Sequence, residues 1–270
     1  MRATVKAPDI STLRLFDSCV TLGRVVCSGL QRSVTADNVL AVMDKYDIAE
    51  ALVHSNEARL VRPKSRGNER LLRQIEGLSR LHPVWVLEPP ASPDPKAARR
   101  MVEDMLAAGV GAARLMMGAA PPLRWIWKDL CQALEAHRVP CLLDFAPLRS
   151  PSTQSTPDAL MLDKLRDLCL AHPELPMILS HHSGGLGLSY AVLPLIRRVE
   201  NLHIDVTSIV NYWRKVAAEL GPHRVFFATG MPFYDPAILV SNVQYDEKLD
   251  VSAKRLICGD NLHRLMEAVR

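Results

Sequence analysis

Short apolar runs that end in a polar or charged side chain recur along this chain. Eight of them read as strands, at residues 13–23, 50–55, 84–89, 111–117, 139–145, 176–180, 202–207 and 224–230. The runs are nearly continuous rather than alternating, which is typical of strands buried on both faces of a parallel sheet. Segments with apolar residues at helical spacing separate them, so the pattern predicts strands and helices in strict alternation.

Eight strand–helix units in a chain of 270 residues are the expected pattern of an α/β protein with the (β/α)8 TIM-barrel fold. We expect residues 1–12 to form an N-terminal arm and residues 13–270 to form a single barrel domain. A doubly wound open sheet is the alternative, but no G-x-G-x-x-G motif opens a helix after a strand.

Composition narrows the class of function. The 270 residues are 48% hydrophobic and carry a net charge of +4, and no basic run is interleaved with aromatic residues, which argues against nucleic acid. Charged residues interrupt every long apolar stretch, which argues against export and membrane spanning. Six cysteines without C-x-x-C spacing predict reduced thiols. We expect a cytoplasmic protein that binds a small-molecule substrate or ligand, and a homodimer is left open.

In a barrel, the carboxyl ends of all eight strands converge on one pole, where active sites lie. The polar side chains at these ends therefore form a predicted ring: Asp17, Cys19, Thr21, His54, Glu88, Arg114, Asp144, His181, His182, Asp205, Thr207 and Thr229. Buried charged groups need partners or a ligand, because an unpaired charge in apolar surroundings costs several kcal/mol. Their convergence offers both.

Each member of the ring has a structural interpretation as well. Asp17 and Asp205 could hold backbone N–H groups, His54 could be a core histidine, and Glu88 could be solvated at the rim. Arg114 and Asp144 on buried strands favour function, since a planar guanidinium can bind a substrate carboxylate with two hydrogen bonds. Of the two adjacent histidines, we expect His182 to face the site.

The segment 56–67 is predicted to be a basic loop. Together with the following residues it carries Arg59, Arg62, Lys64, Arg66 and Arg70. These charges could steer an anionic substrate to the rim, with Arg66 among the substrate-binding residues. A solvated surface is the alternative.

Four motifs in order resemble the amidohydrolase superfamily, specifically the metal-dependent hydrolases and decarboxylases related to aminocarboxymuconate-semialdehyde decarboxylase. L-F-D-S-C-V-T-L-G is similar to that family's first-strand D-x-H-x-H-x-G, L-S-H-H-S-G-G to its H-x-G-G, and R-V-F-F-A-T-G-M-P-F-Y-D-P to its G-T-D-x-P-F. K-R-L-I-C-G-D-N-L-H-R-L-M resembles its closing helix. The resemblance spans nearly the whole chain and implies a TIM barrel with hydrolase or lyase activity.

The chain departs from that pattern at the metal ligands. Cys19 and Thr21 stand where the family has two histidines, Asp144 stands at the strand-five histidine, and Gly230 stands at the strand-eight aspartate. His182 alone matches. A catalytic zinc needs three protein ligands and an open position for water, so the resemblance implies a degraded or absent family metal site.

Three hypotheses follow. Cys19, Asp144 and His182 could form a remodelled zinc site, since thiolate, carboxylate and imidazole all bind zinc. Alternatively, the barrel could use acid–base chemistry with no cofactor, with His182 as the base, Asp144 or Asp17 orienting it and Arg114 binding the anion. In the third, catalysis is lost and the protein acts as a ligand-binding or scaffold protein.

Overall fold

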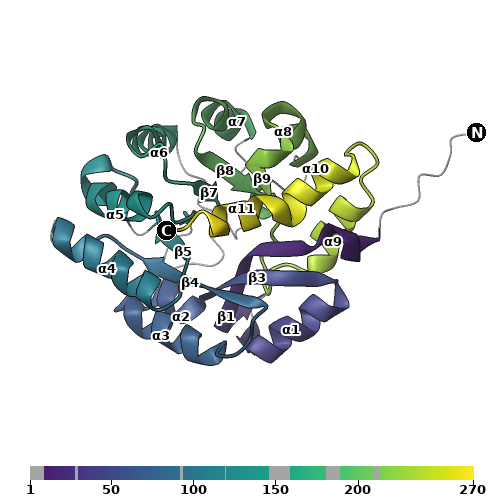
Figure 1. Cartoon of the computed structure of the whole chain (residues 1–270), viewed down its shortest axis with the longest axis horizontal. Coiled ribbons are helices and arrows are strands. Elements are labelled where there is room, and N and C mark those ends of the chain that lie inside the picture. The colour runs from purple at the N-terminus through teal and green to yellow at the C-terminus, as the bar shows by residue number, and fades with distance from the viewer. Residues whose placement is uncertain are drawn as a thin grey trace, which may run out of the picture.

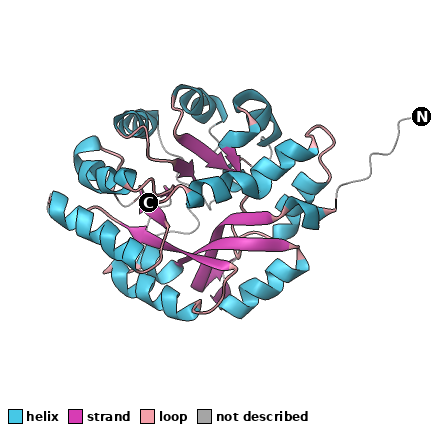
Figure 2. Cartoon of the chain, in the orientation of Figure 1, coloured by secondary structure: helices cyan, strands magenta, loops and turns pink. Residues whose placement is uncertain are grey.

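The computed structural model describes residues 9–27, 30–91, 94–118, 120–145, 159–180, 189–209 and 213–270. Its sheet has the strand order β2-β1-β3-β4-β5-β6-β7-β8-β9, in which β1 through β9 pair in parallel apart from the antiparallel β2. The strands curl into a cylinder surrounded by helices (Figures 1 and 2). This confirms the predicted (β/α)8 barrel.

All eight predicted strands are present in the structure. They are β1 (Leu15–Cys27), β3 (Ile48–Ser55), β4 (Leu81–Leu87), β5 (Ala112–Met116), β6 (Cys141–Asp144), β7 (Met177–Leu179), β8 (Leu202–Asp205) and β9 (Val225–Phe226). Successive parallel strands are separated by helices, as the apolar periodicity predicts.

Helices surround the cylinder and also cover its ends. In chain order they are α1 (Ala36–Lys45), α2 (Asn56–Leu60), α3 (Lys64–Gln74), α4 (Pro95–Ala107), α5 (Arg124–Ala136), α6 (Ala159–Ala171), α7 (Ser189–Arg198), α8 (Trp213–Leu220), α9 (Pro236–Gln244), α10 (Val251–Arg255) and α11 (Asn261–Glu267). No helix among the described residues combines the length and the apolar character that crossing a bilayer requires.

Closure of the cylinder depends on an irregular segment. β9 has only two residues, and the chain beyond it, residues 227–231, takes over the pairing with β1. Ser18 N donates to Phe227 O at 3.0 Å, Thr21 N to Met231 O at 3.0 Å, and Gly230 N to Cys19 O at 3.1 Å. These three backbone hydrogen bonds join the first strand to the last.

Two local predictions are wrong. Segment 56–67 is not a loop: Ser55 caps α2, and α3 begins at Lys64, so much of the basic segment is helical. β1 does not stop at Gly23, where φ is +99°, but continues to Cys27 and pairs with the unpredicted β2 (Leu30–Val34). Glycine adopts this φ without steric cost, so the strand bends there rather than ending.

The predicted N-terminal arm is only partly described. Residues 1–8 lie outside the described ranges, and Ile10–Leu13 forms the 3-10 helix η1, in which Ile10 and Leu13 are buried. The boundary at residue 12 and the single-domain assignment stay predictions.

The barrel interior begins with a layer of apolar side chains near the amino ends of the strands, called here the inner apolar layer. Its members are Phe16, Leu52, Val84, Ala112, Leu142, Ile178 and Phe226. Leu262 of α11 is buried against this layer, and Leu265 and Met266 pack beside it. Helix α11 therefore covers the amino-terminal pole, where it crosses the centre of Figure 1. The opposite pole carries the polar side chains.

Candidate active site

The alternation of side chains along the strands places the predicted residues in one layer. His54, Arg114, Asp144 and Ser180 each lie two positions beyond a member of the inner apolar layer on the same run of chain. Side chains two apart on a strand face the same side, so these groups also point into the cylinder. All four are at most 1% exposed. The structure thus brings three of the predicted strand-end groups, His54, Arg114 and Asp144, together at the carboxyl-terminal pole.

A single carboxylate oxygen holds two arginines at the centre of this layer. Asp144 Oδ2 accepts from Arg114 Nε at 2.9 Å and from Arg59 Nε at 2.9 Å. Arg114 is fully buried, and burial works to lower the pKa of its guanidinium, but the pKa is raised because the Asp144 carboxylate and the hydrogen bonds to Asp144 and Cys19 act in the opposite direction. Among the described residues, the group formed by Arg59, Arg114 and Asp144 has one more cation than carboxylate, while the buried carboxyls of Asp17 and Asp205 lie in the same layer. The extra cation favours an anion at Arg59.

The two arginines differ in what their remaining nitrogens do. Arg114 donates from Nη1 to Cys19 Sγ at 3.4 Å and from Nη2 to Ser180 O at 3.3 Å, so each of its nitrogens has a protein acceptor. Arg59 donates from Nη1 to Asn56 Oδ1 at 3.2 Å, and Nη2 has no acceptor among the described residues. The Arg59 side chain is 10% exposed. Arg59, rather than Arg114, is therefore the guanidinium with a donor left for a ligand.

Cys19 reaches the interior because β1 contains an irregularity. The pairing of β1 with β3 shifts register between Asp17 and Val20, which is the signature of a β-bulge. Cys19 Sγ accepts from Arg114 and from Ser180 Oγ at 3.4 Å. Burial, the largest cause, raises the pKa of its thiol to about 12, although Arg114 acts in the opposite direction. Cys19 is therefore a neutral thiol at pH 7.

Asp17 joins β1 to the segment that closes the barrel. Its Oδ1 accepts from Cys19 N at 3.0 Å and Thr229 N at 2.9 Å, and its Oδ2 accepts a short hydrogen bond from Thr229 Oγ1. Burial raises the pKa of this carboxyl to about 7, partly offset by the hydrogen bonds from Thr229 and Cys19. Both oxygens are thus engaged with the protein, as the structural interpretation of Asp17 expects. Its role in orienting His182 stays a prediction.

His54 and Asp205 complete the buried layer. His54 Nε2 lies 3.1 Å from Thr21 Oγ1 on the paired strand β1. Asp205 Oδ1 accepts from Thr207 Oγ1 at 2.6 Å and Ser208 N at 3.0 Å, and burial raises the pKa of its carboxyl despite these hydrogen bonds. Both residues lie where the sequence predicts them, and their substrate-binding role stays a prediction.

Glu88 and Arg66 lie farther from this layer. Glu88 pairs with Arg62 Nε at 2.7 Å and with Lys64 Nζ at 3.2 Å, and its side chain is 12% exposed. It thereby ties the basic segment to the end of β4. Arg66 is exposed on α3 and has no hydrogen bond or ion pair among the described residues. Substrate contact by either residue stays a prediction.

His181 and His182 lie outside the described residues, so the predicted base has no described geometry. The residue that sequence analysis did not single out is Arg59, which it treated only as one charge of a basic loop. The available signal was the capping serine: Ser55 begins a helix directly after β3, and this turns Arg59 back over the pole. Asn56, 4% exposed, supports Arg59 from the same helix.

The described donors do not fit a divalent metal ion. No group of three His, Cys, Asp or Glu side chains suited to a metal occurs within the described ranges. The cation already in contact with both Cys19 and Asp144 is the Arg114 guanidinium. A divalent ion between these two ligands would also meet the positive charge of Arg114. The zinc hypothesis for Cys19, Asp144 and His182 is therefore unsupported by the two ligands that are described.

Gly230 stands where the resemblance implies an aspartate. Its φ is +67°, and a Cβ atom there would lie 2.9 Å from Tyr234 Cδ2 and 3.2 Å from Thr207 Cγ2. A side chain at this position would be strained and would crowd Tyr234. The local backbone is thus built for glycine.

Comparisons with known proteins agree with the fold. The family model described as Amidohydrolase matches residues 69–266. The chain is similar to a 2,6-dihydroxybenzoate decarboxylase from Rhizobium, with 17% identity, coverage of 94% of this chain and 98% of that chain, and a TM-score of 0.69. It is similar to a 5-carboxyvanillate decarboxylase from Sphingomonas paucimobilis at 15% identity, with 96% and 100% coverage and a TM-score of 0.67.

A third similar structure holds a metal. It is a dihydroxybenzoic acid decarboxylase from Polaromonas with bound manganese and the inhibitor 2-nitroresorcinol, at 17% identity, with 87% and 86% coverage and a TM-score of 0.66. No curated protein matches the sequence. At these identities, the solved structures establish the shared fold alone.

Proposed function

Because this chain belongs to the amidohydrolase family, we propose that it is a cytoplasmic hydrolase or lyase that acts on a small carboxylate at the carboxyl-terminal pole of its barrel. The family match supports the reaction class, and the decarboxylases among its structural neighbours have benzoate or vanillate carboxylates as their named substrates. The substrate class for this chain rests on its own charges, which follow.

The observation that carries the proposal is the pair of arginines on Asp144. The excess positive charge of this cluster lies at the pole where substrates enter TIM barrels. Arg59 is its accessible end, and its unused Nη2 is the donor that we assign to the substrate carboxylate. A charge-assisted hydrogen bond of this kind contributes about 1.5–3 kcal/mol. Arg114 holds Asp144 in place, so we assign it a positioning role.

We further propose that the reaction proceeds without a bound metal. The guanidinium of Arg114 supplies a fixed positive charge between Cys19 and Asp144, and it requires no metal to balance the buried carboxylate. The chemistry is then acid–base catalysis, with His182 as the expected base. A guanidinium stays protonated at every pH at which the protein is folded, so this charge is permanent.

A binding protein without catalysis is the second candidate. One observation favours it: Asp17, Arg114, Asp144 and Asp205 are each 0% exposed, and the first three have hydrogen bonds that account for their charges within the protein. A ligand would then contact Arg59 and be released unchanged.

The test combines elemental analysis with activity. Purified protein is treated with a chelator, its zinc and manganese contents are measured, and proton release and CO2 release are followed with a panel of hydroxybenzoates, other small carboxylates and lactones. We expect turnover at metal contents far below stoichiometric, loss of turnover in His182→Gln, and a raised KM in Arg59→Gln. Arg99→Gln is the matched control, because Arg99 is exposed on α4 and has no ion pair among the described residues.

The outcomes separate the three hypotheses. Turnover that appears only on adding a divalent ion would refute the metal-free reaction while leaving the hydrolase or lyase assignment. Saturable binding of a carboxylate without turnover would favour the binding protein. Full activity in His182→Gln would exclude His182 as the base.

A further inference from the structure

One side chain in the barrel interior is polar, whereas its neighbours at the same height are apolar. Seven strands contribute apolar side chains to the inner apolar layer, and β8 contributes His203 at the corresponding height. The imidazole packs edge-on against Phe226, with ring centroids 5.3 Å apart, and the residue is 9% exposed. Its Nδ1 has no hydrogen-bond partner in the described part of the chain. An unpaired buried polar atom is costly, so its presence calls for a reason.

A cavity opens beside this histidine at the amino-terminal pole. It measures about 240 Å³, and its lining includes Arg138, Glu174, Asn201, His203, Arg264 and Leu265. Elsewhere on α11, His263 makes a tilted ring contact with Phe16 of β1, with the ring centroids 4.8 Å apart. The cavity is open to solvent and is large enough for a small ligand. The site is at the opposite pole from the Arg59–Asp144 cluster.

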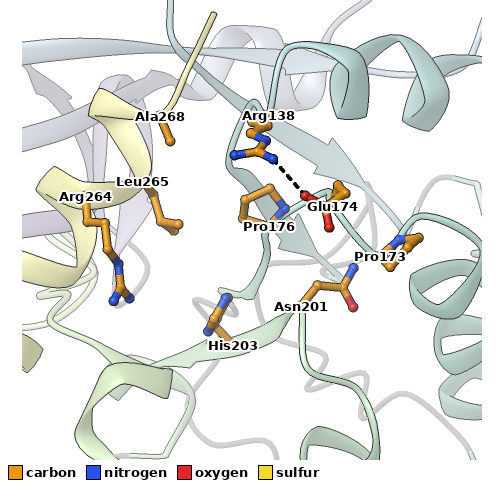
Figure 3. A pocket seen from close by; sticks show the side chains of 9 residues that line it. All are labelled: Arg138, Pro173, Glu174, Pro176, Asn201, His203, Arg264, Leu265 and Ala268. Atoms are coloured by element: carbon orange, nitrogen blue, oxygen red, sulfur yellow. Dashed lines mark hydrogen bonds and ion pairs between the residues drawn. The ribbon is translucent and has the colours of Figure 1, made fainter.

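The charges around the cavity are positive in excess. Arg138 pairs with Glu174 at 3.0 Å, and these two lie together at one end of the cavity in Figure 3. Arg264 and His203 lie at the other end, projecting from α11 and β8. Among the described residues, Arg264 has no carboxylate partner. Its one polar contact is a long hydrogen bond of 3.5 Å from Nη2 to Asn261 Oδ1.

A third arginine, Arg224, lies close enough to affect the charge of His203. Arg224 is buried and donates to the carbonyls of Ile196 and Val199 at 2.9 and 2.7 Å. Burial lowers the pKa of its guanidinium and the Glu200 carboxylate partly offsets this, but no described carboxylate forms an ion pair with it. Burial is the main reason that the pKa of His203 falls to about 3, and Arg224, Arg264 and His223 lower it further. An anion would find both a guanidinium donor and a favourable potential here.

We propose that this cavity is a second ligand site, which binds a small oxyanion, a carboxylate or a phosphate, between Arg264 and His203. The guanidinium of Arg264 supplies charge-assisted donors, and Nε2 of His203, the ring nitrogen that is not closed off from solvent, supplies a further N–H. The bound anion joins α11 to β8 across the amino-terminal pole. It thereby stabilises the packing of the last helix on the barrel. This site needs no turnover at the other pole.

The test follows the ring signals of His203 by NMR in protein labelled at histidine. The His203 signal is assigned by its absence in His203→Phe, and inorganic phosphate or acetate is added while chloride keeps the ionic strength constant. We expect a saturable shift of the His203 signal, an upward shift of its titration midpoint, and binding weakened about tenfold or more in Arg264→Gln, the loss typical of one charge-assisted hydrogen bond. Arg99→Gln, which removes an exposed arginine far along the chain, should bind as the wild type does.

Each outcome decides the proposal. Saturation by phosphate alone identifies a tetrahedral oxyanion as the ligand, and saturation by acetate alone identifies a carboxylate. A His203 signal unmoved by both anions overturns the site. So does an equal response in Arg264→Gln and the wild type, which would indicate an adventitious ion only. Because the readout is binding at the amino-terminal pole, failure here leaves the function proposed for the opposite pole intact.

Discussion

Replacing Asp144 by asparagine should destabilise the protein more than replacing Arg114 by methionine. In Asp144→Asn, the two guanidinium groups lose their shared carboxylate, and one of them is fully buried. A pair of unit charges about 4 Å apart interacts by about 4 kcal/mol at an effective dielectric constant of 20, and stranding a buried charge costs about 3–5 kcal/mol. In Arg114→Met, Asp144 keeps Arg59 at 2.9 Å, so we expect a loss of about 1–3 kcal/mol.

The assay is equilibrium unfolding in urea, which does not screen charges, monitored by circular dichroism. Arg138→Met is the matched control, because Arg138 pairs with Glu174 at 3.0 Å with side chains 41% and 65% exposed. Such an exposed pair contributes about 0–1 kcal/mol. Our reasoning would be refuted if Asp144→Asn unfolded within about 1 kcal/mol of the wild type, below the range given for a stranded buried charge. Equal losses in Asp144→Asn and Arg114→Met would also contradict it.

Three further predictions concern pH, backbone and binding. The pKa of His203 is about 3 in the folded protein and about 6.5 in the unfolded chain. The unfolded state therefore binds more protons as the pH falls through 6.5, and the stability of the folded state decreases. Between pH 7 and 5, the unfolding free energy in urea should fall by about 2 kcal/mol more for the wild type than for His203→Phe. Gly230→Ala should lower the unfolding free energy by about 1–3 kcal/mol, because a Cβ meets Tyr234 at a positive φ, whereas Gly77→Ala, with a positive φ in open space, should lose about 1 kcal/mol; equal losses would show that Tyr234 yields. Arg59→Gln should raise the KM for the substrate about 10- to 100-fold with little change in kcat, and a fall in kcat alone would place Arg59 in the chemical step instead.

The barrel could be predicted from the sequence because its signal is local and repeated. Each buried parallel strand needs an apolar run, and each crossover needs a helix, so eight repeats leave little choice of fold. The clustering of Arg114 and Asp144 was also predictable, since both follow an apolar residue by two positions on strands whose ends must converge. The position of a residue along its strand was therefore enough to predict that Arg114 and Asp144 lie together.

Features set by tertiary contacts could not be predicted in the same way. The bulge that turns Cys19 inward depends on the register between β1 and β3, which no single strand encodes. Arg59 lies in a stretch whose many charges suggest solvent, and its partner Asp144 is 85 residues away. The β2 strand and the closure by residues 227–231 likewise depend on neighbours distant in sequence. Charge and length alone carry no information on such pairings.

The side chain of Asp17 bridges the place where the first strand of the barrel meets the last. Both of its carboxylate oxygens accept hydrogen bonds from Thr229, and the three backbone hydrogen bonds that close the barrel lie on either side of this contact. A substitution of Asp17 that removes these hydrogen bonds also weakens the closure of the barrel. A loss of activity in an Asp17 variant can therefore be interpreted only together with its measured unfolding free energy.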